Sequence, residues 1–436
     1  MRPIASAACN WHPKETKKMS EPISPAPITP TPITMDKTGQ LNVPDRPIIP
    51  YIEGDGIGQD IWPAAKIVFD AAVKAAFGSE KKVEWLEFFA GEKGFEQTGE
   101  YLSDESLNTI KTHRVAIKGP LATPVGKGMR SLNVKIRQQL DLYACIRPVR
   151  YYPPVPSPVC HPERVDMVVF RENTEDLYAG IEWDSGSQEV TKLLGLLNNE
   201  LNCDLPASCS IGIKPMSPEK TKRLVIKAFE YAFENNRKSV TLMHKGNIMK
   251  FTEGGFRKWG YEAAFERFGD RVITEETLFE IHEGVVPDGV VVIKDRIADM
   301  VFAEVLLRPD NFDIIACPNL NGDYISDALA AQVGGLGMAP GANIGEVCAV
   351  FEATHGTAPD IAGKDMANPC SLILSGAMMF DHMGWQKVGD LIRDGVSKAL
   401  AQGRVTADLA SQISGGEEVT CSRFSRIIAE QILFAQ

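Results

Sequence analysis

The sequence predicts an α/β protein in which layers of helices enclose a partly parallel sheet. Short apolar runs that are typical of strands recur along the chain, among them VDMVVFRE, SVTLMHKG, DGVVVIKD and FDIIACPN. Helical stretches such as PEKTKRLVIKAFEYAFENN separate these runs, and alternation of this kind is typical of α/β layers. No internal repeat of solenoid period is evident, so repeat architectures are not expected.

Composition limits the classes of function. Of the 436 residues, 44% are hydrophobic and 24% are charged, as in ordinary globular proteins, and the longest apolar runs fall short of a membrane span. The formal net charge of -11 argues against general binding to nucleic acid or to anionic membranes. The cysteines are scattered without a C-x-x-C pair, which suits reduced thiols in the cytoplasm and not a disulfide framework.

The elements are expected in the following order. Residues 1–45 are rich in Pro, Thr and Ile and predict an extended, mobile leader. The segment RPIIPYIEGDGIGQDIWPAAKIVFDAAVKAAFG then indicates a strand, a glycine-rich loop and a helix. Its GDGIG lacks the third glycine of a dinucleotide fingerprint, so a Rossmann unit is not expected. Residues 179–215 break the alternation with two strand-like ends around polar material and are interpreted as an insertion.

Three arginines at the ends of elements indicate a site for a small polycarboxylate. A helix over SLNVKIRQQL would place Asn133 and Arg137 on one face, with Ser131 at its amino end. Arg147 leaves the half-apolar strand DLYACIRPV, and Arg171 follows the strand VDMVVF. One such arginine alone would be interpreted as a member of a surface ion pair. Three of them in an acidic protein indicate a site for a ligand with several carboxylates, because guanidinium groups bind carboxylates through two parallel hydrogen bonds.

Two aspartates suggest a divalent metal ion. Asp323 and Asp327 in NLNGDYISDALAAQ lie four residues apart, and a cation between them would offset their repulsion. Ligation by oxygen alone favours Mg2+ or Mn2+. The segment KDRIAD offers Asp299 as a third acid, whereas we interpret Asp295 as an acid that complements a helix dipole.

Two further side chains are candidates for proton transfer. Lys245 follows the strand SVTLM, where burial could lower the pKa of its ammonium group, although an exposed lysine is the plain alternative. Tyr178 follows Arg171 closely and could act as a phenolic acid, although a packed tyrosine with a capped hydroxyl is more common.

Long motifs relate residues 46–436 to a known family. They are YIEGDGIG, RSLNVKIRQ, FRENTEDLYAG, HKGNIMKFTEG, NLNGDYISDALAAQVGG and FEATHGTAPDIAGKD. On these motifs the chain resembles the isocitrate/isopropylmalate dehydrogenase family, and within it the homodimeric bacterial enzymes that act on isocitrate. The resemblance implies an α/β/α sandwich without a Rossmann unit. The large domain would comprise residues 46–142 and 334–436, the small domain residues 143–178 and 216–333, and residues 179–215 would form a clasp between two subunits.

The resemblance also implies the reaction, which is oxidative decarboxylation of isocitrate to 2-oxoglutarate and CO2 in the tricarboxylic acid cycle. The residues expected to hold the substrate's carboxylates are Ser131, Asn133, Arg137, Arg147 and Arg171. Asp323 and Asp327 would bind Mg2+ or Mn2+ together with Asp299 of the partner subunit. The partner's Lys245 would act as the base, and Tyr178 would protonate the enolate left by CO2.

The loop HGTAPDIAGKD bears on the choice of cofactor. NADP-using relatives carry lysine and tyrosine at the positions of Asp360 and Ile361, and tyrosine and arginine at those of Ala407 and Ser411. A carboxylate at position 360 can accept hydrogen bonds from ribose hydroxyls and repels a phosphate by about 1 to 4 kcal/mol. We therefore expect NAD as the cofactor. The resemblance places Thr123 near the nicotinamide, and around the adenosine it places His355, Gly356, Ala358, Asp360, Ile361 and Asn368.

Several alternatives remain open. The chain could use NADP, or act on homoisocitrate or 3-isopropylmalate, although Ser131 and Asn133 would pack poorly against an isopropyl group. A metal-dependent phosphohydrolase would need a second metal ion and more ligands, and the seven histidines form no cluster in the sequence. A non-catalytic binding module is disfavoured because metal, base and cofactor groups occur together.

Overall fold

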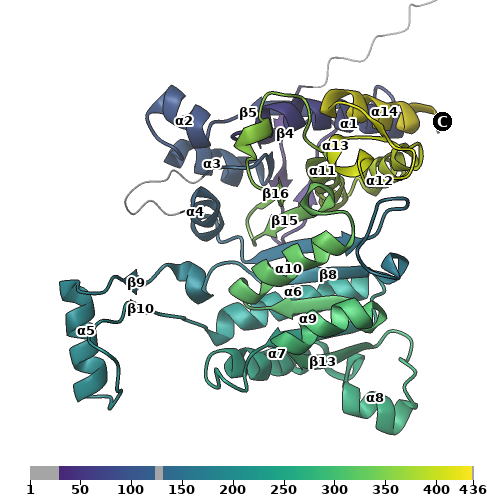
Figure 1. Ribbon diagram of the computed structural model, residues 1–436. Coiled ribbons are helices and arrows are strands. Elements are labelled where there is room, and N and C mark those ends of the chain that lie inside the picture. Colours follow the sequence, from purple (N-terminus) through teal and green to yellow (C-terminus); the bar gives the residue numbers. More distant parts are fainter. Residues whose placement is uncertain (1–28, 123–130, 435–436) are drawn as a thin grey trace, which may run out of the picture.

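A twelve-stranded sheet runs through the whole of the computed structural model, which describes residues 29–122 and 131–434 (Figure 1). The strands lie in the order β1 (Thr31–Pro32), β4 (Pro47–Ile52), β6 (Val115–Lys118), β16 (Ala349–Ala353), β15 (Pro340–Ile344), β7 (Ala144–Arg150), β8 (Asp166–Glu172), β14 (Ile314–Cys317), β11 (Ser239–His244), β13 (Val291–Ile297) and β12 (Val272–Thr274), with β5 (Glu84–Glu87) beside β4. Neighbouring strands are parallel towards both edges and antiparallel from β16 through β15 and β7 to β8. The predicted α/β fold with a partly parallel sheet is confirmed.

Helices cover both faces of the sheet, because successive residues of its strands point to opposite sides. On β8, Val168 and Phe170 pack with α6 (Pro218–Glu234) and α7 (Glu253–Phe268), whereas Met167 and Val169 pack with α9 (Ala298–Leu307) and α10 (Asn319–Gln332). Towards β4, one face carries α1 (Gly58–Phe77), α11 (Cys370–His382), α12 (Gln386–Ala401) and α14 (Cys421–Phe434), and the other carries α3 (Asp104–His113) and α4 (Leu132–Gln139).

Further short elements complete the two halves of the sheet's surroundings. They are α2 (Gly91–Thr98), α8 (Glu275–His282), α13 (Ala407–Ala410) and the short strand pair β17 (Arg404–Val405) and β18 (Glu417–Glu418). In the part of the chain that the structure describes, no helix combines the length and the apolar character that crossing a membrane requires.

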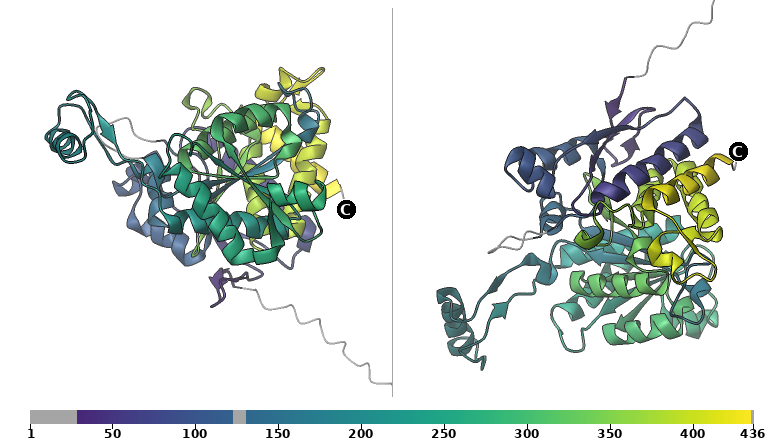
Figure 2. Two further views of the ribbon diagram at one scale, coloured as in Figure 1. Left: turned by 90° about the horizontal axis from the view of Figure 1, so that it is seen from below. Right: turned by 45° about the horizontal axis from the view of Figure 1, so that its top comes forward.

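An arm built from the predicted insertion projects away from the sheet (Figures 1 and 2). Its two legs pair as the antiparallel strands β9 (Glu182–Trp183) and β10 (Ile211–Gly212), and α5 (Gln188–Asn199) lies beyond them. The arm exposes apolar side chains, including Leu196 at 43% and Leu201 at 60%. The two strand-like ends are confirmed, whereas the function of the arm as a clasp stays a prediction.

The expected leader extends too far, because ordered strands begin at Thr31. β1 pairs in parallel with β4, and Ile33 is fully buried in the core. A hairpin of β2 (Thr34–Met35) and β3 (Leu41–Asn42) follows, and its turn is closed by the Asp36 carboxylate, which accepts hydrogen bonds from Thr38 N and Gln40 N at 2.8 and 3.0 Å. A proline is tolerated in an edge strand, so the proline-rich composition does not exclude strands here.

Candidate active site

Two of the predicted arginines lie on one face of the central antiparallel pair. Arg171 on β8 is opposite Cys145 on β7, and Arg147 lies two residues beyond Cys145. Directly opposed residues and residues two apart share a face, so both guanidinium groups point to the same side of the sheet. Both side chains are buried, with 1% of Arg171 and 7% of Arg147 exposed.

Helix α10 passes over this face and supplies partners for Arg171. The Nε of Arg171 donates to Asn319 Oδ1 at 2.9 Å, and its Nη1 forms a close ion pair with Asp323. The approach depends on Gly322, because a Cβ added there would lie 2.4 Å from Arg171 Cγ. Gly322 is a packing residue of this site that the sequence did not indicate, although it directly precedes Asp323 in the quoted motif.

Arg147 binds the next turn of the same helix. Its Nη1 donates to Ser326 Oγ at 2.6 Å and to Asp327 Oδ1 at 3.2 Å. Burial raises the pKa of Asp327, whereas the charge of Arg171 lowers the pKa of Asp323 although burial opposes it. The two carboxylates therefore differ in their environment, and both face guanidinium groups.

Tyr178 joins the same cluster from the short helix η2 (Asp176–Ala179). Its hydroxyl donates to Asp323 Oδ2 at 2.5 Å, and the Arg171 guanidinium lies 4.9 Å from the centre of its ring. Burial and this hydrogen bond raise the pKa of Tyr178 to about 12, so the phenol stays protonated at neutral pH. We refer to Arg147, Arg171, Tyr178, Asp323 and Asp327 as the arginine–aspartate cluster.

Helix α4 brings the other predicted substrate residues to this cluster. Ser131 directly precedes the helix, and Asn133 and Arg137 lie four residues apart within it, as expected. Arg137 Nη2 donates to Glu352 Oε1 at 2.7 Å, and Lys118 Nζ lies 2.7 Å from Glu352 Oε2. Although burial opposes it, these two cations hold the pKa of Glu352 well below its usual range.

Glu352 and Lys118 were missed by the sequence reasoning. The only signal was an acid within the apolar run EVCAVFEA and a lysine at the end of HRVAIK, and neither pattern identifies its partner. Both side chains are buried, Lys118 at 2% and Glu352 at 5% exposed. Their ion pair fixes the orientation of Arg137, because a buried charge is stable only when it is paired.

The site contains polar atoms without partners. Asn133 Oδ1, Arg137 Nε and Arg147 Nε are buried and form no hydrogen bond within the described residues. Burial and the positive charges of Arg137 and Arg147 lower the pKa of Arg171. Buried polar groups in native proteins are nearly always paired, so the free Nε donors of Arg137 and Arg147 fit an anionic ligand with several oxygens, while Asn133 Oδ1 can accept from a hydroxyl group.

The metal ligands predicted from the sequence are only partly brought together. Asp323 and Asp327 lie one turn apart on α10, and their oxygens suit a hard divalent cation. Within the described ranges, no group of three or more His, Cys, Asp or Glu side chains could hold a metal ion. Within the described chain, Asp323 and Asp327 therefore lie together, and Asp299 does not join them.

The remaining two candidates form a pair of their own. Lys245 follows β11 and Asp299 follows β13, and the register of these parallel strands places His244 opposite Ile297. Lys245 Nζ forms a close ion pair with Asp299, and this bond lowers the pKa of Asp299. The Lys245 side chain is 33% exposed and that of Asp299 65% exposed. We call them the lysine–aspartate pair.

The interpretation of Asp295 as a helix-dipole acid is wrong. Strand β13 continues to Ile297, so Asp295 lies in a strand and not in the first turn of a helix. Its carboxylate lies 3.1 Å from His244 Nε2 and accepts a hydrogen bond from Tyr261 Oη at 2.9 Å. Although burial opposes them, these bonds and the nearby Arg257 lower the pKa of Asp295 to about 2. Asp295 is therefore an internal structural acid beside Lys245.

The predicted adenosine loop follows β16 and has open polar groups. His355 Nδ1 is bonded to Gly356 O at 2.9 Å, while His355 Nε2 is buried and has no partner in the described part of the chain. A Cβ added to Gly356 would meet nothing within 4 Å. Ala358 has a φ of 39°, and the short helix η6 (Pro359–Ile361) carries Asp360 and Ile361. Thr123 lies outside the described residues.

The far end of this loop is tied to α13. Asn368 is buried, and its Nδ2 donates to Asp408 Oδ2 at 3.0 Å. Asp408 directly follows Ala407, so the two segments singled out for cofactor choice lie together in the fold. Between them, Lys364 is exposed and its Nζ donates to the backbone oxygen of Asp360 at 2.7 Å. The loop therefore carries a positive charge beside its aspartate.

Comparison with known proteins identifies relatives over nearly the whole chain. The family model "Isocitrate/isopropylmalate dehydrogenase" matches residues 48–428. Isocitrate dehydrogenase (NADP) of Streptococcus mutans is 54% identical over 395 residues, which cover 89% of this chain and 97% of that protein. Isocitrate dehydrogenase (NADP) of Archaeoglobus fulgidus is 54% identical over 396 residues, which cover 91% and 95%. The crystal structure of isocitrate dehydrogenase from Methylococcus capsulatus is 35% identical, with a TM-score of 0.73 over 88% of this chain and 99% of that one.

The prediction that the chain prefers NAD is wrong. Both curated relatives, at 54% identity over most of the chain, are named as NADP enzymes. The prediction rested on Asp360, Ile361, Ala407 and Ser411, which lack the lysine, tyrosine and arginine side chains of NADP-using relatives, and it gave weight to the negative charge of Asp360. Asp360 is exposed, so water screens its repulsion of a phosphate to about 1 kcal/mol, and the neighbouring Lys364 supplies the opposite charge.

Proposed function

The chain belongs to the isocitrate/isopropylmalate dehydrogenase family, and on that premise we propose that it is a metal-dependent isocitrate dehydrogenase that uses NADP. The observation that carries the proposal is a set of three buried arginines, two of which pair with aspartates, with free donors among them. A tricarboxylate has enough oxygens to pair with these groups while it presents two more to a cation. The names of the relatives at 54% identity support both the substrate and the cofactor.

The substrate-binding residues would act through charge and orientation. Arg137, Arg147 and Arg171 would bind the carboxylates, with Ser131 and Asn133 at the amino end of α4 supplying hydrogen bonds. Arg147 and Arg171 now pair with Asp327 and Asp323, so binding exchanges these ion pairs for contacts with substrate. Because the guanidinium groups are buried, they would be oriented before the substrate arrives.

The oxygens of Asp323 and Asp327 fit a divalent cation such as Mg2+ or Mn2+, with Asp299 of the partner subunit as the third acid. When bound, such an ion stabilises negative charge on the oxygens of the reacting carbon skeleton. Lys245 would remove the hydroxyl proton as hydride leaves to the nicotinamide. Tyr178, protonated because of its raised pKa, would donate a proton to the carbon that loses CO2.

We propose a homodimer in which each site takes Lys245 and Asp299 from the other subunit. In one chain this pair stands apart from the arginine–aspartate cluster, and no group of three acids in the described residues could hold a metal ion, which supports completion by a second copy. The arm of residues 179–215, with its exposed leucines, would interlock the two subunits. The division into large and small domains that the sequence suggests belongs to the same proposal.

The adenosine of NADP would lie along the loop that follows β16. His355, whose Nε2 is buried without a partner in the described structure, would face it, and Gly356, Ala358, Ile361 and Asn368 would form the walls of the pocket. Lys364 would supply the positive charge for the 2′-phosphate beside Asp360. Thr123 would lie near the nicotinamide.

The test is an assay of the purified chain with isocitrate and Mg2+ or Mn2+, with NADP and NAD in parallel, recorded by the absorbance of the reduced nicotinamide. We expect turnover that requires the metal salt and a higher kcat/KM with NADP than with NAD. The same assay with 3-isopropylmalate is the control and should give no signal. Absence of turnover with isocitrate, or a higher kcat/KM with NAD, would contradict the proposal.

A further inference from the structure

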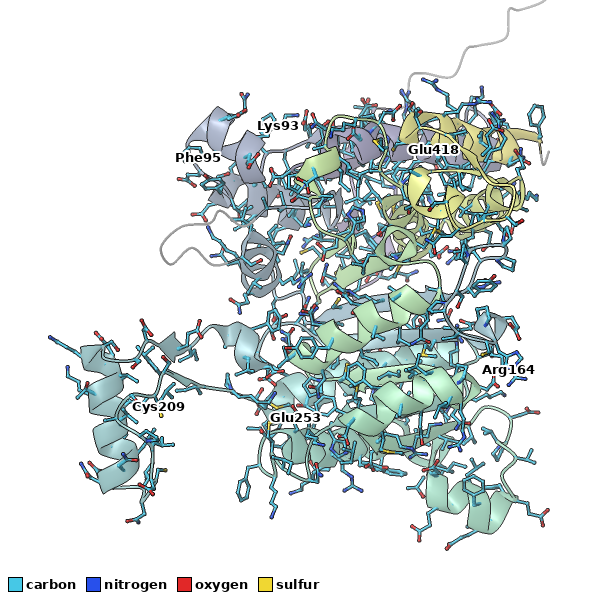
Figure 3. The ribbon with its side chains drawn as sticks, in the orientation of Figure 1. Lys93, Phe95, Arg164, Cys209, Glu253 and Glu418 are labelled. Atoms are coloured by element: carbon cyan, nitrogen blue, oxygen red, sulfur yellow. The ribbon has the colours of Figure 1, made fainter. Side chains whose placement is uncertain are left out.

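A buried acid supports the segment that carries Lys245. Glu253 is the first residue of α7, is fully buried, and lies eight residues after Lys245 (Figure 3). Its Oε2 accepts hydrogen bonds from the backbone nitrogen of Lys245 and from Asn321 Nδ2, the latter at 3.0 Å. Lys214 Nζ lies 3.0 Å from the other oxygen, Oε1, as an ion pair without the geometry of a hydrogen bond.

The loop between Lys245 and Glu253 has little packing of its own. Ile248 is 69% exposed and Phe251 is 91% exposed, so apolar burial does not hold this segment. The backbone nitrogen of Lys245 instead binds the Glu253 carboxylate, and a charged acceptor binds more strongly than a neutral one. Two side chains therefore hold the chain where it leaves the buried strand β11: the Glu253 carboxylate at Lys245 N, and His244, whose Nδ1 accepts a hydrogen bond from Gly246 N at 3.0 Å.

The same carboxylate belongs to a buried network that reaches the arginine–aspartate cluster. Lys214 also pairs with Asp176, whose Oδ2 accepts a hydrogen bond from Leu320 N at 2.9 Å. Although burial opposes it, the bond to Asp176 raises the pKa of Lys214, so the lysine remains charged. Glu253 thus has a charged partner that offsets the cost of its burial.

We propose that Glu253 is a positioning residue for Lys245, and that its effect on catalysis is exerted in the site of the partner subunit. The inference rests on the proposed function, in which Lys245 acts across the interface. It goes beyond that function because Glu253 would touch neither substrate nor cofactor. Its carboxylate holds the backbone from which the Lys245 ammonium reaches the other chain's substrate.

The variant Glu253→Gln keeps an oxygen acceptor for the Lys245 amide and removes the charge that pairs with Lys214. In the homodimer we expect kcat to fall by about 10- to 100-fold, with KM for isocitrate unchanged, because the base is displaced while the arginines are not. Glu266→Gln is the matched control, since Glu266 lies on the same helix and pairs with Lys222 at the surface. This control should keep its activity.

Hybrid dimers with two different tags show where the effect acts. In the first hybrid, one chain carries Glu253→Gln and the other carries Asp323→Asn. The only site with an intact Asp323 then takes Lys245 from a chain with an intact Glu253. We expect this hybrid to be as active as a reference hybrid of one unmodified chain and one Asp323→Asn chain. In the second hybrid, one chain carries both substitutions and the other carries none. Relative to the reference hybrid, we expect kcat to fall by about 10- to 100-fold, as in the Glu253→Gln homodimer.

The two hybrids contain the same two substitutions, so general destabilisation affects them equally. Equal losses in both, or a loss confined to the first, would overturn the proposal. If Glu253→Gln does not fold, Lys214→Met in the same two arrangements should give a smaller loss with the same asymmetry. A hybrid of Lys245→Met with Asp323→Asn that regains no activity would instead refute the shared site itself, so the two failures are distinguishable.

Discussion

The two halves of the proposed site differ in how they are held. The arginines of the arginine–aspartate cluster are buried, with Arg171 at 1% and Arg147 at 7% exposed, whereas the side chains of Asp323 and Asp327 are 34% and 50% exposed. Each of these charges is paired within the chain. The lysine–aspartate pair is partly open to solvent and its two members pair with each other. The arginines proposed to bind substrate are therefore fixed in advance, whereas the proposed base and third acid stand where a second copy could use them.

The strongest way to break this comparison is to separate the two halves by mutation. Lys245→Met should remove the base and Asp323→Asn a metal ligand, and each homodimer should lose about 10²- to 10⁴-fold in kcat. A hybrid of the two chains contains one site with all groups intact, so activity should return to half that of the unmodified dimer. The measurement is the specific activity of doubly tagged hybrids.

The control for that experiment is Lys250→Met, an exposed lysine of the same loop, which should leave activity unchanged. A hybrid that stays as inactive as its parents would mean that each chain uses its own Lys245. The arginine–aspartate cluster and the lysine–aspartate pair would then act within the same chain and would not be shared between subunits.

A second test concerns pH, and it exploits a buried acid just before η2. Glu175 is 5% exposed, and burial, assisted by the charge of Glu172, raises its pKa to about 7 although Ser217 N donates to it. The pKa of Glu175 in the folded protein lies above the unfolded value of 4.5. Protonated Glu175 therefore contributes fully to the stability of the fold below about pH 4.5, and this contribution is lost as the pH rises through about 7.

The unfolding free energy of the unmodified protein should therefore fall by about 3 kcal/mol between about pH 5 and about pH 8, and Glu175→Gln should not show this fall. Denaturant unfolding of both proteins at the two pH values measures it. Glu96→Gln, an exposed acid on α2, is the control and should leave the pH dependence unchanged. If Glu175→Gln keeps the slope of the unmodified protein, Glu175 does not titrate near neutrality.

A third change tests the close packing of the internal half. Gly322→Ala would place a Cβ 2.4 Å from Arg171 Cγ, so α10 or the arginine must move. We expect a loss of about 1 to 3 kcal/mol in unfolding free energy and a higher KM for isocitrate. Asp394→Ala, at an exposed position of α12, is the control and should change neither quantity. A Gly322→Ala protein with unchanged KM would show that Arg171 does not bind substrate.

Local patterns in the sequence were sufficient for part of the site. Helical spacing placed Asn133 and Arg137 one turn apart on α4, and strand alternation brought Arg147 out of β7, since both depend only on near neighbours. The error at Asp295 has the same origin, because a four-residue spacing fits a helix but does not exclude that its first member lies within a strand.

The residues that were missed act through contacts between distant segments. Glu352 binds Arg137 across 215 positions of the chain, and Gly322 matters only because α10 crosses β8 at Arg171. The strand at Thr31 was missed because its partner is β4, and composition alone does not describe pairing. Such contacts depend on the topology of the sheet, which no single motif contains.

The smallest expected effect lies in the exposed loop after β16, where charges are screened by water. Lys364→Gln should raise KM for NADP about fivefold, because one solvent-exposed ion pair contributes about 1 kcal/mol, while kcat and KM for isocitrate stay unchanged. Lys387→Gln is the control, since Lys387 is also exposed and donates to a backbone oxygen, that of Ala76, at 3.0 Å. If Lys364→Gln leaves KM for NADP unchanged, another group binds the 2′-phosphate. Charged side chains would then be assigned to ligand binding only at the buried substrate site, and not in the exposed loop.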